Sequence, residues 1–562
     1  MKVLPKTDVV LVGLGAAGGI AAHVLTAAGR KVVALEAGED RSSADFVKQL
    51  DELGHPFYRN ALGAKLVNKA IPTWRRNESL AAGDPIYTVP SVNGVGGTSL
   101  HYGGASWRLC EGDFRARSDT IARYGEAALP PGSAVADWPV NYAELEPFYD
   151  KVEYAIGVSG DNTGNPWEPP RSRPFPMPPL RHKGWTELAH GRLKAMGYHP
   201  FRQPAAVNSV PYGGRAACSY CGYCSGFGCW NDAKGSTLVT TIPLARKSGL
   251  LDMRAECRVT RILSDASGRV TGVRYVDRNG VECEQPAGIV IIAAFVYETV
   301  RRLLLSTSER YPRGLANNLG QVGKYFMTHT YVIVNGQYDG LDVKAMNGLG
   351  AQATIIDDFY GDNFDHKDLG FIRGASVGTF SEVRPIGAAG AKPPEVPSWG
   401  PKYKEWLTTS ARSVVAFFAQ MEVLPYHANY LDLDPAKRDP WGDPVTRVTY
   451  DMQGNEARMA TFLEGKLTEI HKRFGASHVW TAMKAPPTPV YSHVFGGARM
   501  GNDPATSVVD ANGMAHEVPN LAIMGGALFP TTGGRNPTQT MQALAWRTSE
   551  YIAGNFAKLA QG

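Results

Sequence analysis

The N-terminal segment alternates apolar runs with glycine-rich positions in the order strand, turn, helix, strand. An apolar, β-branched run over Val9–Val12 predicts a strand buried on both faces. A helical apolar pattern from Ile20 to Ala28 follows and ends at Gly29. A second apolar run, Val32–Leu35, predicts the next strand. This order is typical of a parallel α/β unit with its strands at the centre of a domain.

Three glycines, Gly13, Gly15 and Gly18, stand between the first strand and the helix at the G-x-G-x-x-G spacing. The first glycine allows the tight turn, the second lets the backbone approach a pyrophosphate, and the third lets the helix pack closely on the strand. Glu36 follows Gly18 by 18 residues, where a carboxylate accepts hydrogen bonds from ribose hydroxyls. We therefore expect a dinucleotide. FAD and NAD share an adenosine diphosphate, so the turn does not distinguish them.

Later patterns predict how the chain returns to this sheet. The segments AECRVTRILSD and GRVTGVRYVD alternate as an antiparallel hairpin, and GIVIIAA reads as a buried strand before an apolar helix over Val296–Leu305. Asn141 with Glu144 three residues on predicts the N-terminus of an amphipathic helix. Residues 331–480 alternate strands and loops, which suggests a mixed or antiparallel sheet in a substrate-side domain.

Length and composition restrict the class of protein. A chain of 562 residues exceeds the size of a single core, so at least two domains are expected. The 43% hydrophobic and 20% charged content is that of a soluble globular protein, and a net charge of +5 gives no case for nucleic acid. No run approaches the ~18 to 20 apolar residues of a membrane span. The N-terminus enters its first strand without a signal-peptide pattern, so the chain's own signals indicate the cytoplasm.

Four of the seven cysteines form a cluster. Cys218, Cys221, Cys224 and Cys229 run C-x2-C-x2-C-x4-C, interleaved with glycine. Bacterial ferredoxin runs use similar spacing, and the four thiols can converge on one centre, so the spacing favours an iron–sulfur cluster. Structural zinc usually draws on two separated C-x-x-C pairs, and disulfides would strain such short loops. Zinc, free thiols and disulfides stay as alternatives.

A second glycine-rich stretch, SVNGVGGTSLHYGGASWRL over Ser91–Leu109, holds five glycines in the eleven positions from Gly94 to Gly104. That density lets backbone N–H groups approach a ligand, although a flexible surface loop is the alternative. The N-terminal turn, this stretch and the C-terminal motifs SHVFGGARMG and NLAIMGGALFPTTGGRNPTQT together resemble the glucose-methanol-choline (GMC) family of FAD oxidoreductases. Within it, the chain is most similar to the large flavoprotein subunits of bacterial gluconate 2-dehydrogenase and of FAD-dependent sugar dehydrogenases.

The resemblance implies an α/β fold with a Rossmann-like FAD-binding domain and a discontinuous substrate domain built on a mainly antiparallel sheet. The expected FAD-binding parts are residues 1–110, 236–330 and 491–562. Residues 111–235 would form a connecting region with the cysteine cluster, and 331–490 the substrate domain. Further cofactor contacts are implied for Gly97, Thr98, His101, Gly526, Asn536, Pro537 and Thr538. His101 lies where some members attach FAD covalently, although the subfamily mostly binds FAD noncovalently.

The resemblance also implies the chemistry. His493 and Asn536 match the family's catalytic pair in its His–Asn version. A histidine takes a hydroxyl proton near neutral pH as a hydride leaves the carbinol carbon for flavin N5, and an asparagine side chain holds the same hydroxyl in line. Asn536, Pro537 and Thr538 are expected at a helix N-terminus, whose positive dipole end favours negative charge on reduced flavin.

We therefore expect an FAD-dependent dehydrogenase acting on an alcohol carbon of a sugar, glycoside or sugar acid. The resembled subfamily implies a [3Fe–4S] cluster on the cysteines, a small subunit bearing the export signal, and a cytochrome c acceptor. This would place the complex in the periplasm or at the membrane, with the cytoplasm as the alternative. The competing functions are an oxidase that uses oxygen, a flavin-containing lyase, and a non-catalytic FAD- or zinc-binding protein.

Overall fold

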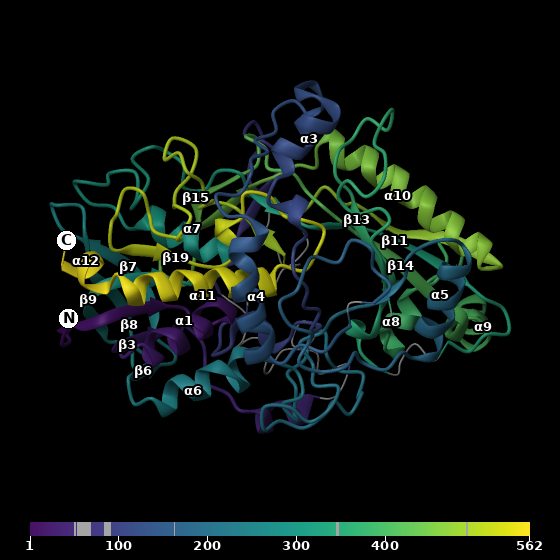
Figure 1. Cartoon of the computed structure of the whole chain (residues 1–562), viewed down its shortest axis with the longest axis horizontal. Helices are drawn as coiled ribbons and strands as arrows, with labels where there is room; N and C mark the ends of the chain where they lie inside the picture. Colours follow the sequence, from purple (N-terminus) through teal and green to yellow (C-terminus); the bar gives the residue numbers. More distant parts are fainter. Residues whose placement is uncertain are drawn as a thin grey trace.

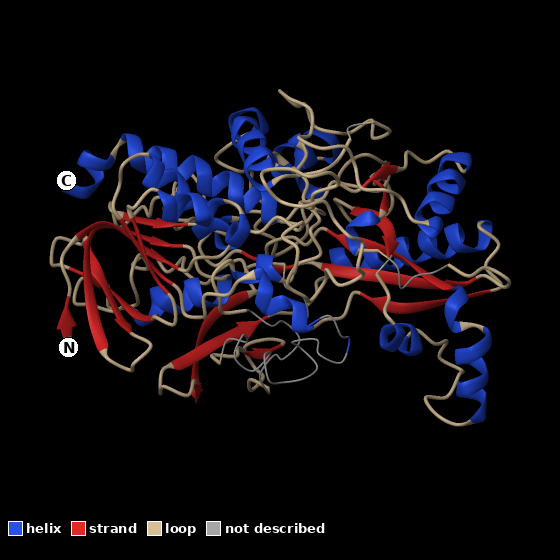
Figure 2. Cartoon of the chain, turned by 90° about the horizontal axis from the view of Figure 1, so that it is seen from below, coloured by secondary structure: helices blue, strands red, loops and turns tan. Residues whose placement is uncertain are grey.

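Two sheets stand at opposite ends of the long axis of the molecule, and both chain ends lie beside the first of them (Figure 1). Loops occupy much of the space between the sheets (Figure 2). The computed structural model describes residues 1–49, 52, 69–83, 92–161, 163–343, 348–380, 382–489 and 493–561. Ser91 and Ser492, which open two of the motifs quoted above, lie outside these residues.

The first sheet is built from both ends of the chain and from residues 251–292. Its strand order is β6-β3-β2-β9-β8-β7, and β1 and β19 also pair with β9. Strands β2, β3, β6, β9 and β19 pair in parallel, whereas β7 and β8 form an antiparallel extension. The strands are β1 (Lys2–Val3), β2 (Thr7–Val12), β3 (Val32–Leu35), β6 (Leu251–Arg254), β7 (Arg258–Ser264), β8 (Val270–Val276), β9 (Glu282–Ile292) and β19 (Leu521–Ile523).

Helices cover this parallel sheet, which explains why its strands are apolar without alternation. Val9, Val10 and Leu11 of β2 are fully buried, and so are Ile289 and Ile291 of β9. Helix α1 packs beside α11, and α11 also packs on α4. Asn141 caps α4 with the expected capping box, in which Asn141 and Glu144 exchange two hydrogen bonds of 2.9 Å. The helices here are α1 (Ala16–Ala27), α4 (Tyr142–Ile156), α6 (Thr241–Lys247), α7 (Val296–Leu305), α11 (Thr538–Gly554) and α12 (Phe556–Gln561). Helix α3 (Ala116–Tyr124) stands apart from this sheet, at the top of Figure 1.

The second sheet is antiparallel in every pairing, with the order β17-β11-β14-β13-β12-β5. Helix α10 packs along β11, β14 and β17. The strands are β5 (Phe201–Arg202), β11 (Thr330–Gln337), β12 (Thr354–Ile356), β13 (Ala375–Phe380), β14 (Val414–Met421) and β17 (His478–Lys484). The helices around them are α5 (Gly184–Ala195), α8 (Pro385–Gly390), α9 (Pro401–Thr409) and α10 (Gly454–Arg473).

Two small sheets lie between the larger ones. Strands β15 (Tyr430–Arg438), β16 (Pro444–Thr449) and β4 (Thr73–Arg75) form a three-stranded sheet. Strand β10 (Met327–Thr328) pairs antiparallel with β18 (Val494–Phe495), placing Thr328 opposite Val494. This short pairing matters for the site, because the residues next to it, His329 and His493, become neighbours: His329 N–H donates to the carbonyl of His493 over 3.0 Å.

The fold class predicted from the sequence is confirmed, and the differences concern boundaries. Helix α1 begins at Ala16, before the predicted Ile20, because small residues at its start carry no apolar period. Helix α11 begins at Thr538, two residues after Asn536, and runs to Gly554. Strand β5, from the segment expected to connect the domains, joins the second sheet. None of the helices in the described ranges combines the length and apolar character that a membrane span requires.

Candidate active site

A cavity of about 1030 Å³ lies at the carboxyl ends of β2, β3 and β9. Ligands of parallel α/β sheets bind at this edge, because loops and helix N-termini converge there. Three motifs that are far apart in the sequence line this cavity: the N-terminal turn, the glycine-rich stretch and the C-terminal motifs. The predicted residues that line it are Gly13, Gly15, Glu36, Gly97, Thr98, His101, Gly526, Asn536, Pro537, Thr538 and the predicted base His493.

Backbone geometry requires glycine at two positions of the N-terminal turn, Gly13 and Gly18. Gly13 has a φ of +91°, and a Cβ at Gly18 would lie 2.2 Å from the carbonyl oxygen of Gly13. Gly18 does not line the cavity; its place is in the packing of α1 against the turn. Gly97 has a φ of +56°, and a Cβ there would lie 2.8 Å from Cα of Gly15. The glycine-rich stretch (residues 94–104) therefore packs against the dinucleotide turn and is not an exposed surface loop.

Glu36 holds the loops at one end of the cavity. Its Oε1 accepts the backbone N–H groups of Gly38 (2.9 Å) and Gly94 (3.0 Å), and its Oε2 accepts that of Leu14 (2.9 Å). Burial raises the pKa of the Glu36 carboxyl, and these backbone hydrogen bonds oppose that rise. The sequence predicted only a ribose acceptor here. The side chain also joins the strand β2 turn, the β3 end and the glycine-rich stretch.

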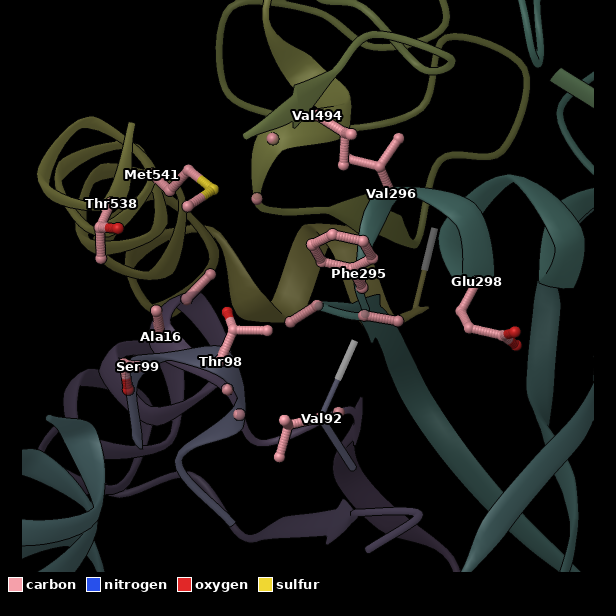
Figure 3. A pocket seen from close by; sticks show the side chains of 18 of the residues that line it. Ala16, Val92, Thr98, Ser99, Phe295, Val296, Glu298, Val494, Thr538 and Met541 are labelled. Atoms are coloured by element: carbon pink, nitrogen blue, oxygen red, sulfur yellow. The ribbon is translucent and has the colours of Figure 1, made fainter. Parts of the chain in front are cut away.

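Two helix N-termini face the cavity. Gly15, Ala16 and Ala17 at the start of α1 line it, and so do Pro537 and Thr538 at the start of α11. Figure 3 shows Thr538 and Met541 of α11 on its wall, with Ala16 and Thr98 beside them. The first N–H groups of a helix lack intrahelical partners and carry partial positive charge, which favours an anionic ligand.

This cradle fits FAD. Two glycine-rich segments come into backbone contact at the turn, where a pyrophosphate requires close approach. The buried carboxylate of Glu36 lies where a ribose would bind, and the start of α11 lies on the cavity wall near the start of α1. His101 lines the same cavity, and its carbonyl accepts the N–H of Gly226 over 2.7 Å. The prediction for His101 stays that of a noncovalent contact with FAD.

The predicted catalytic pair is brought together. Nδ2 of Asn536 lies 3.2 Å from Nε2 of His493, and both residues line the cavity. Burial lowers the pKa of His493 to about 4, so its ring is neutral at physiological pH. A neutral imidazole can take a proton from a hydroxyl group, and the neighbouring amide N–H can donate a hydrogen bond to the same oxygen.

Three further residues around the pair were not predicted as functional. His329 Nδ1 lies 3.2 Å from His493 Nδ1, and the Tyr331 hydroxyl lies 3.4 Å from the same atom. The indole Nε1–H of Trp107 donates to Oδ1 of Asn536 over 2.8 Å. His329 and Tyr331 flank Thr330 at the start of β11, and Trp107 lies near the end of the Ser91–Leu109 motif. A polar cluster at the start of a predicted strand is the only sequence signal that marks the first two.

Buried polar contacts fix the loop that carries Asn536. Within this Asn536 loop (residues 533–537), the N–H of Gly534 donates to the Tyr360 hydroxyl over 3.2 Å. Arg535, which is 1% exposed, pairs with Asp357 at 2.5 Å and donates to the carbonyl of Arg108 over 2.7 Å. Breaking such a buried ion pair leaves an uncompensated charge, so the loop has one strongly preferred position.

The cysteine loop (residues 218–229) lies against the cavity. Ser225 and Gly226 of this loop line the cavity, and Gly226 bonds the carbonyl of His101. The ammonium of Lys234, a residue 2% exposed, donates to the carbonyls of Tyr102, Cys224 and Phe227 at 2.8–2.9 Å. The loop therefore shares its backbone contacts with the glycine-rich stretch.

The four thiols share this loop without forming a ligand set. Among the described residues, no three His, Cys, Asp or Glu side chains are arranged to hold a metal ion. Cys229 Sγ donates to Oδ1 of Asn231 over 3.1 Å, and burial raises the pKa of Cys218 to about 11. Because thiols bind metals as thiolates, ligation would require deprotonation and rotation of these side chains. Metal binding by Cys218, Cys221, Cys224 and Cys229 stays a prediction.

The chain is similar to known oxidoreductases over nearly its whole length. Two family models described as GMC oxidoreductase match residues 206–331 and 425–545. The gluconate 2-dehydrogenase flavoprotein of Pantoea cypripedii is 33% identical over 99% of this chain and 95% of its own length. The fructose dehydrogenase large subunit of Gluconobacter japonicus is 28% identical over 97% of this chain and 98% of its own. The crystal structure of pyridoxine 4-oxidase from Mesorbium loti, 16% identical, superposes with a TM-score of 0.61 over 97% of this chain and 99% of that one.

Proposed function

We propose, from the premise that the chain belongs to the GMC oxidoreductase family, that it is an FAD-dependent dehydrogenase of a sugar, glycoside or sugar acid. The family makes it an oxidoreductase of CH–OH groups. The observation that carries the proposal is the contact of 3.2 Å between Asn536 Nδ2 and His493 Nε2 on the wall of the cavity. The similarity to gluconate and fructose dehydrogenases supports a sugar or sugar acid as substrate.

The two side chains have different roles toward the substrate hydroxyl: one is the base and the other a hydrogen-bond donor. Nε2 of His493 accepts the hydroxyl proton, and Nδ2 of Asn536 donates to the hydroxyl oxygen and fixes its position. The hydroxyl oxygen would lie beside this contact, within hydrogen-bond reach of both atoms. When bound, FAD supplies the two-electron acceptor for the hydride that leaves the carbinol carbon. Both side chains are half-buried on the cavity wall, so bound substrate and flavin would complete the exclusion of bulk water from the proton transfer.

The residues proposed to hold FAD follow the cavity from end to end. Gly13 and Gly15 would take the pyrophosphate with the first amides of α1, and Glu36 the ribose. The glycine-rich stretch and the start of α11 would border the isoalloxazine, where the dipole of α11 favours negative charge.

The cysteine loop is proposed to carry an iron–sulfur cluster of the [3Fe–4S] type. Four thiols stand in one loop, and the N–H groups of Tyr220 and Lys234 donate to Sγ of Cys218 (3.3 Å) and Cys229 (3.4 Å). Such N–H···S bonds are typical of cysteine thiolates in these clusters, where they tune the potential. Cys221 is exposed while Ser225 and Gly226 line the cavity, so the loop connects the cavity with the surface.

The partner proteins are also a proposal. The relative from Gluconobacter japonicus is named as a large subunit, which supports an assembly with other subunits. We expect a small subunit bearing the export signal and a cytochrome c acceptor, with the complex in the periplasm. Co-purification from native cells followed by fractionation would test both; a protein found alone in the cytosol contradicts them.

Anaerobic reduction of the bound flavin tests the proposed activity. The purified holoenzyme is mixed with a panel of sugars, sugar acids and polyols, and bleaching of the flavin absorbance is followed. Bleaching by a sugar or sugar acid with a dye or cytochrome as acceptor, and little peroxide in air, is the expected result. Rapid peroxide formation instead identifies an oxidase. Flavin that stays oxidised with every compound rejects the dehydrogenase.

A further inference from the structure

Both ring nitrogens of His493 contact polar side chains. Nδ1 lies 3.2 Å from His329 Nδ1 and 3.4 Å from the Tyr331 hydroxyl, and Nε2 lies 3.2 Å from Asn536 Nδ2. A neutral imidazole carries one proton, on one of its two nitrogens. Its position decides whether Nε2 can act as a base, because a protonated Nε2 has no lone pair to offer.

The contact with His329 requires the proton on Nδ1 of His493. Nε2 of His329 lies 2.7 Å from the carbonyl oxygen of Gly533, which only accepts, so Nε2 of His329 carries a proton. Burial, with His493 nearby, holds the pKa of His329 well below its ordinary range, so this ring is neutral. Its Nδ1 is therefore an acceptor, and His493 Nδ1 must donate.

A second chain of hydrogen bonds gives the same result. Nε2 of Gln420 donates to the carbonyl of Gly534 over 3.1 Å, which fixes the orientation of the amide. Oε1 of Gln420 then accepts the Tyr331 hydroxyl proton over 2.7 Å. With its proton used, the Tyr331 oxygen faces His493 Nδ1 as an acceptor.

The third contact is on the opposite side of the ring. The Trp107 indole can only donate, so Oδ1 of Asn536 faces it and Nδ2 faces His493. The amide N–H groups of Asn536 then require an acceptor at His493 Nε2. Three independent contacts thus assign the same tautomer, and each chain ends on a group whose hydrogen-bonding role is fixed.

We propose that His329, Tyr331 and Trp107 are positioning residues that hold His493 in the Nδ1–H tautomer and so leave Nε2 as the base. The inference rests on the proposed function for its consequence in catalysis. Two of the chains end on the adjacent carbonyls of Gly533 and Gly534. The loop that presents Asn536 to the substrate therefore also sets the proton on His493.

The tautomer can be read directly by NMR of the FAD-loaded protein labelled with ¹⁵N-histidine. Signals of His493 are identified by their loss in His493→Gln, and two-bond ¹H–¹⁵N correlations show which nitrogen is protonated. We expect Nδ1–H at neutral pH in the wild type. An Nε2–H tautomer in the wild type overturns the proposal. This readout needs no substrate, so it stands apart from the failure of the proposed activity.

Variants test whether the two Nδ1 acceptors set the tautomer. The double variant His329→Leu with Tyr331→Phe removes both, and we expect His493 to move toward Nε2–H. Anaerobic flavin reduction should slow at least ~10-fold, up to the ~10²- to 10⁴-fold that general-base assistance supplies, with bound FAD retained. The single variant His329→Gln keeps a donor and an acceptor on one side chain. Its rate of flavin reduction should therefore stay close to that of the wild type. A double variant that keeps both the Nδ1–H tautomer and the wild-type rate contradicts the proposal.

Discussion

The side-chain amide of Asn536 lies 3.2 Å from Nε2 of His493, although 43 residues separate them in the chain. His493 precedes β18, and Asn536 precedes α11. Their contact places a proton acceptor and a hydrogen-bond donor on one small part of the cavity wall. Both side chains are half-buried, and at a partly desolvated site hydrogen bonds control the position of a proton more strongly than they do in water.

Removing the base should stop flavin reduction while leaving FAD in place. We expect His493→Ala to lower the anaerobic rate of flavin reduction by about 10²- to 10⁴-fold. Flavin content, read from absorbance, should match that of the wild type. A loss below tenfold would assign the base to another residue. Because the pKa of His493 is about 4 in the folded protein, the acid limb of kcat/KM should lie well below pH 6.5.

Glu36→Gln should weaken FAD binding, although the side chain keeps its size. The carboxylate accepts three backbone N–H groups, so an amide NH₂ group must face at least one donor. The ribose would also lose its charged acceptor, and a hydrogen bond to a charged group is worth about 1.5–3 kcal/mol, or roughly 10- to 150-fold in the dissociation constant of FAD. Equilibrium titration of the apoprotein with FAD measures it. Glu282→Gln, at the far end of β9 with a side chain 51% exposed, is the control. Equal affinities in both variants would show that Glu36 is not needed for binding.

Gly18→Ala and Gly191→Ala should have opposite effects. A Cβ at Gly18 meets the carbonyl oxygen of Gly13 at 2.2 Å, so the turn must shift at a cost of about 1–3 kcal/mol. Gly191 lies inside α5, where an added Cβ meets nothing within 4 Å, and alanine there should stabilise by about 0.5–1 kcal/mol. Thermal unfolding and FAD content of both variants provide the comparison. Normal FAD content in Gly18→Ala would mean that α1 can move without disturbing the cradle.

Cys221→Ser should affect turnover with a cytochrome acceptor and turnover with a small dye differently. If the cysteine loop carries a cluster, turnover with a cytochrome should fall sharply, while anaerobic flavin bleaching and turnover with a small dye stay near wild type. Cys283→Ser, on β9 away from the loop, is the matched control. Loss of FAD or failure to fold in Cys221→Ser would assign the loop a structural role instead.

Electron paramagnetic resonance and iron analysis identify the centre itself. An oxidised [3Fe–4S] cluster is paramagnetic, whereas zinc, disulfides and an oxidised [4Fe–4S] cluster are silent. A protein that contains iron but has a silent spectrum would hold another type of cluster. A protein without iron would contradict the proposal.

His471 should make the protein less stable in acid. Burial lowers its pKa to about 4, while it donates to the carbonyl of Val334 and accepts from the Tyr338 hydroxyl. Between pH 6.5 and about 4 the unfolded chain binds a proton that the folded chain does not. The free energy of unfolding therefore decreases as the pH is lowered through this range, by at most about 1.4 kcal/mol per pH unit for this group. Urea unfolding midpoints from pH 4.5 to 7.5 should fall less steeply in His471→Gln. Equal slopes in the wild type and in His471→Gln would contradict the assignment.

The sequence by itself determined the nucleotide-binding half of the first sheet. Local patterns are enough there: a buried strand reads as a continuous apolar run, and close packing at Gly18 leaves a glycine at a fixed spacing. The motif around His493 and the helix start after Asn536 also identified the two residues that meet in the cavity. Each of these signals lies within a short segment.

Only the tertiary structure decided what surrounds that pair. His329 reaches His493 through the pairing of β10 with β18, and Gln420 approaches from β14 of the second sheet. Contacts between such distant segments leave no period or spacing in the sequence. The same holds for Glu36, whose three backbone partners depend on how the glycine-rich stretch folds over the turn. The physical reason is that a hydrogen-bonding role is set by the partner an atom meets, and that partner is chosen by the packing of whole sheets.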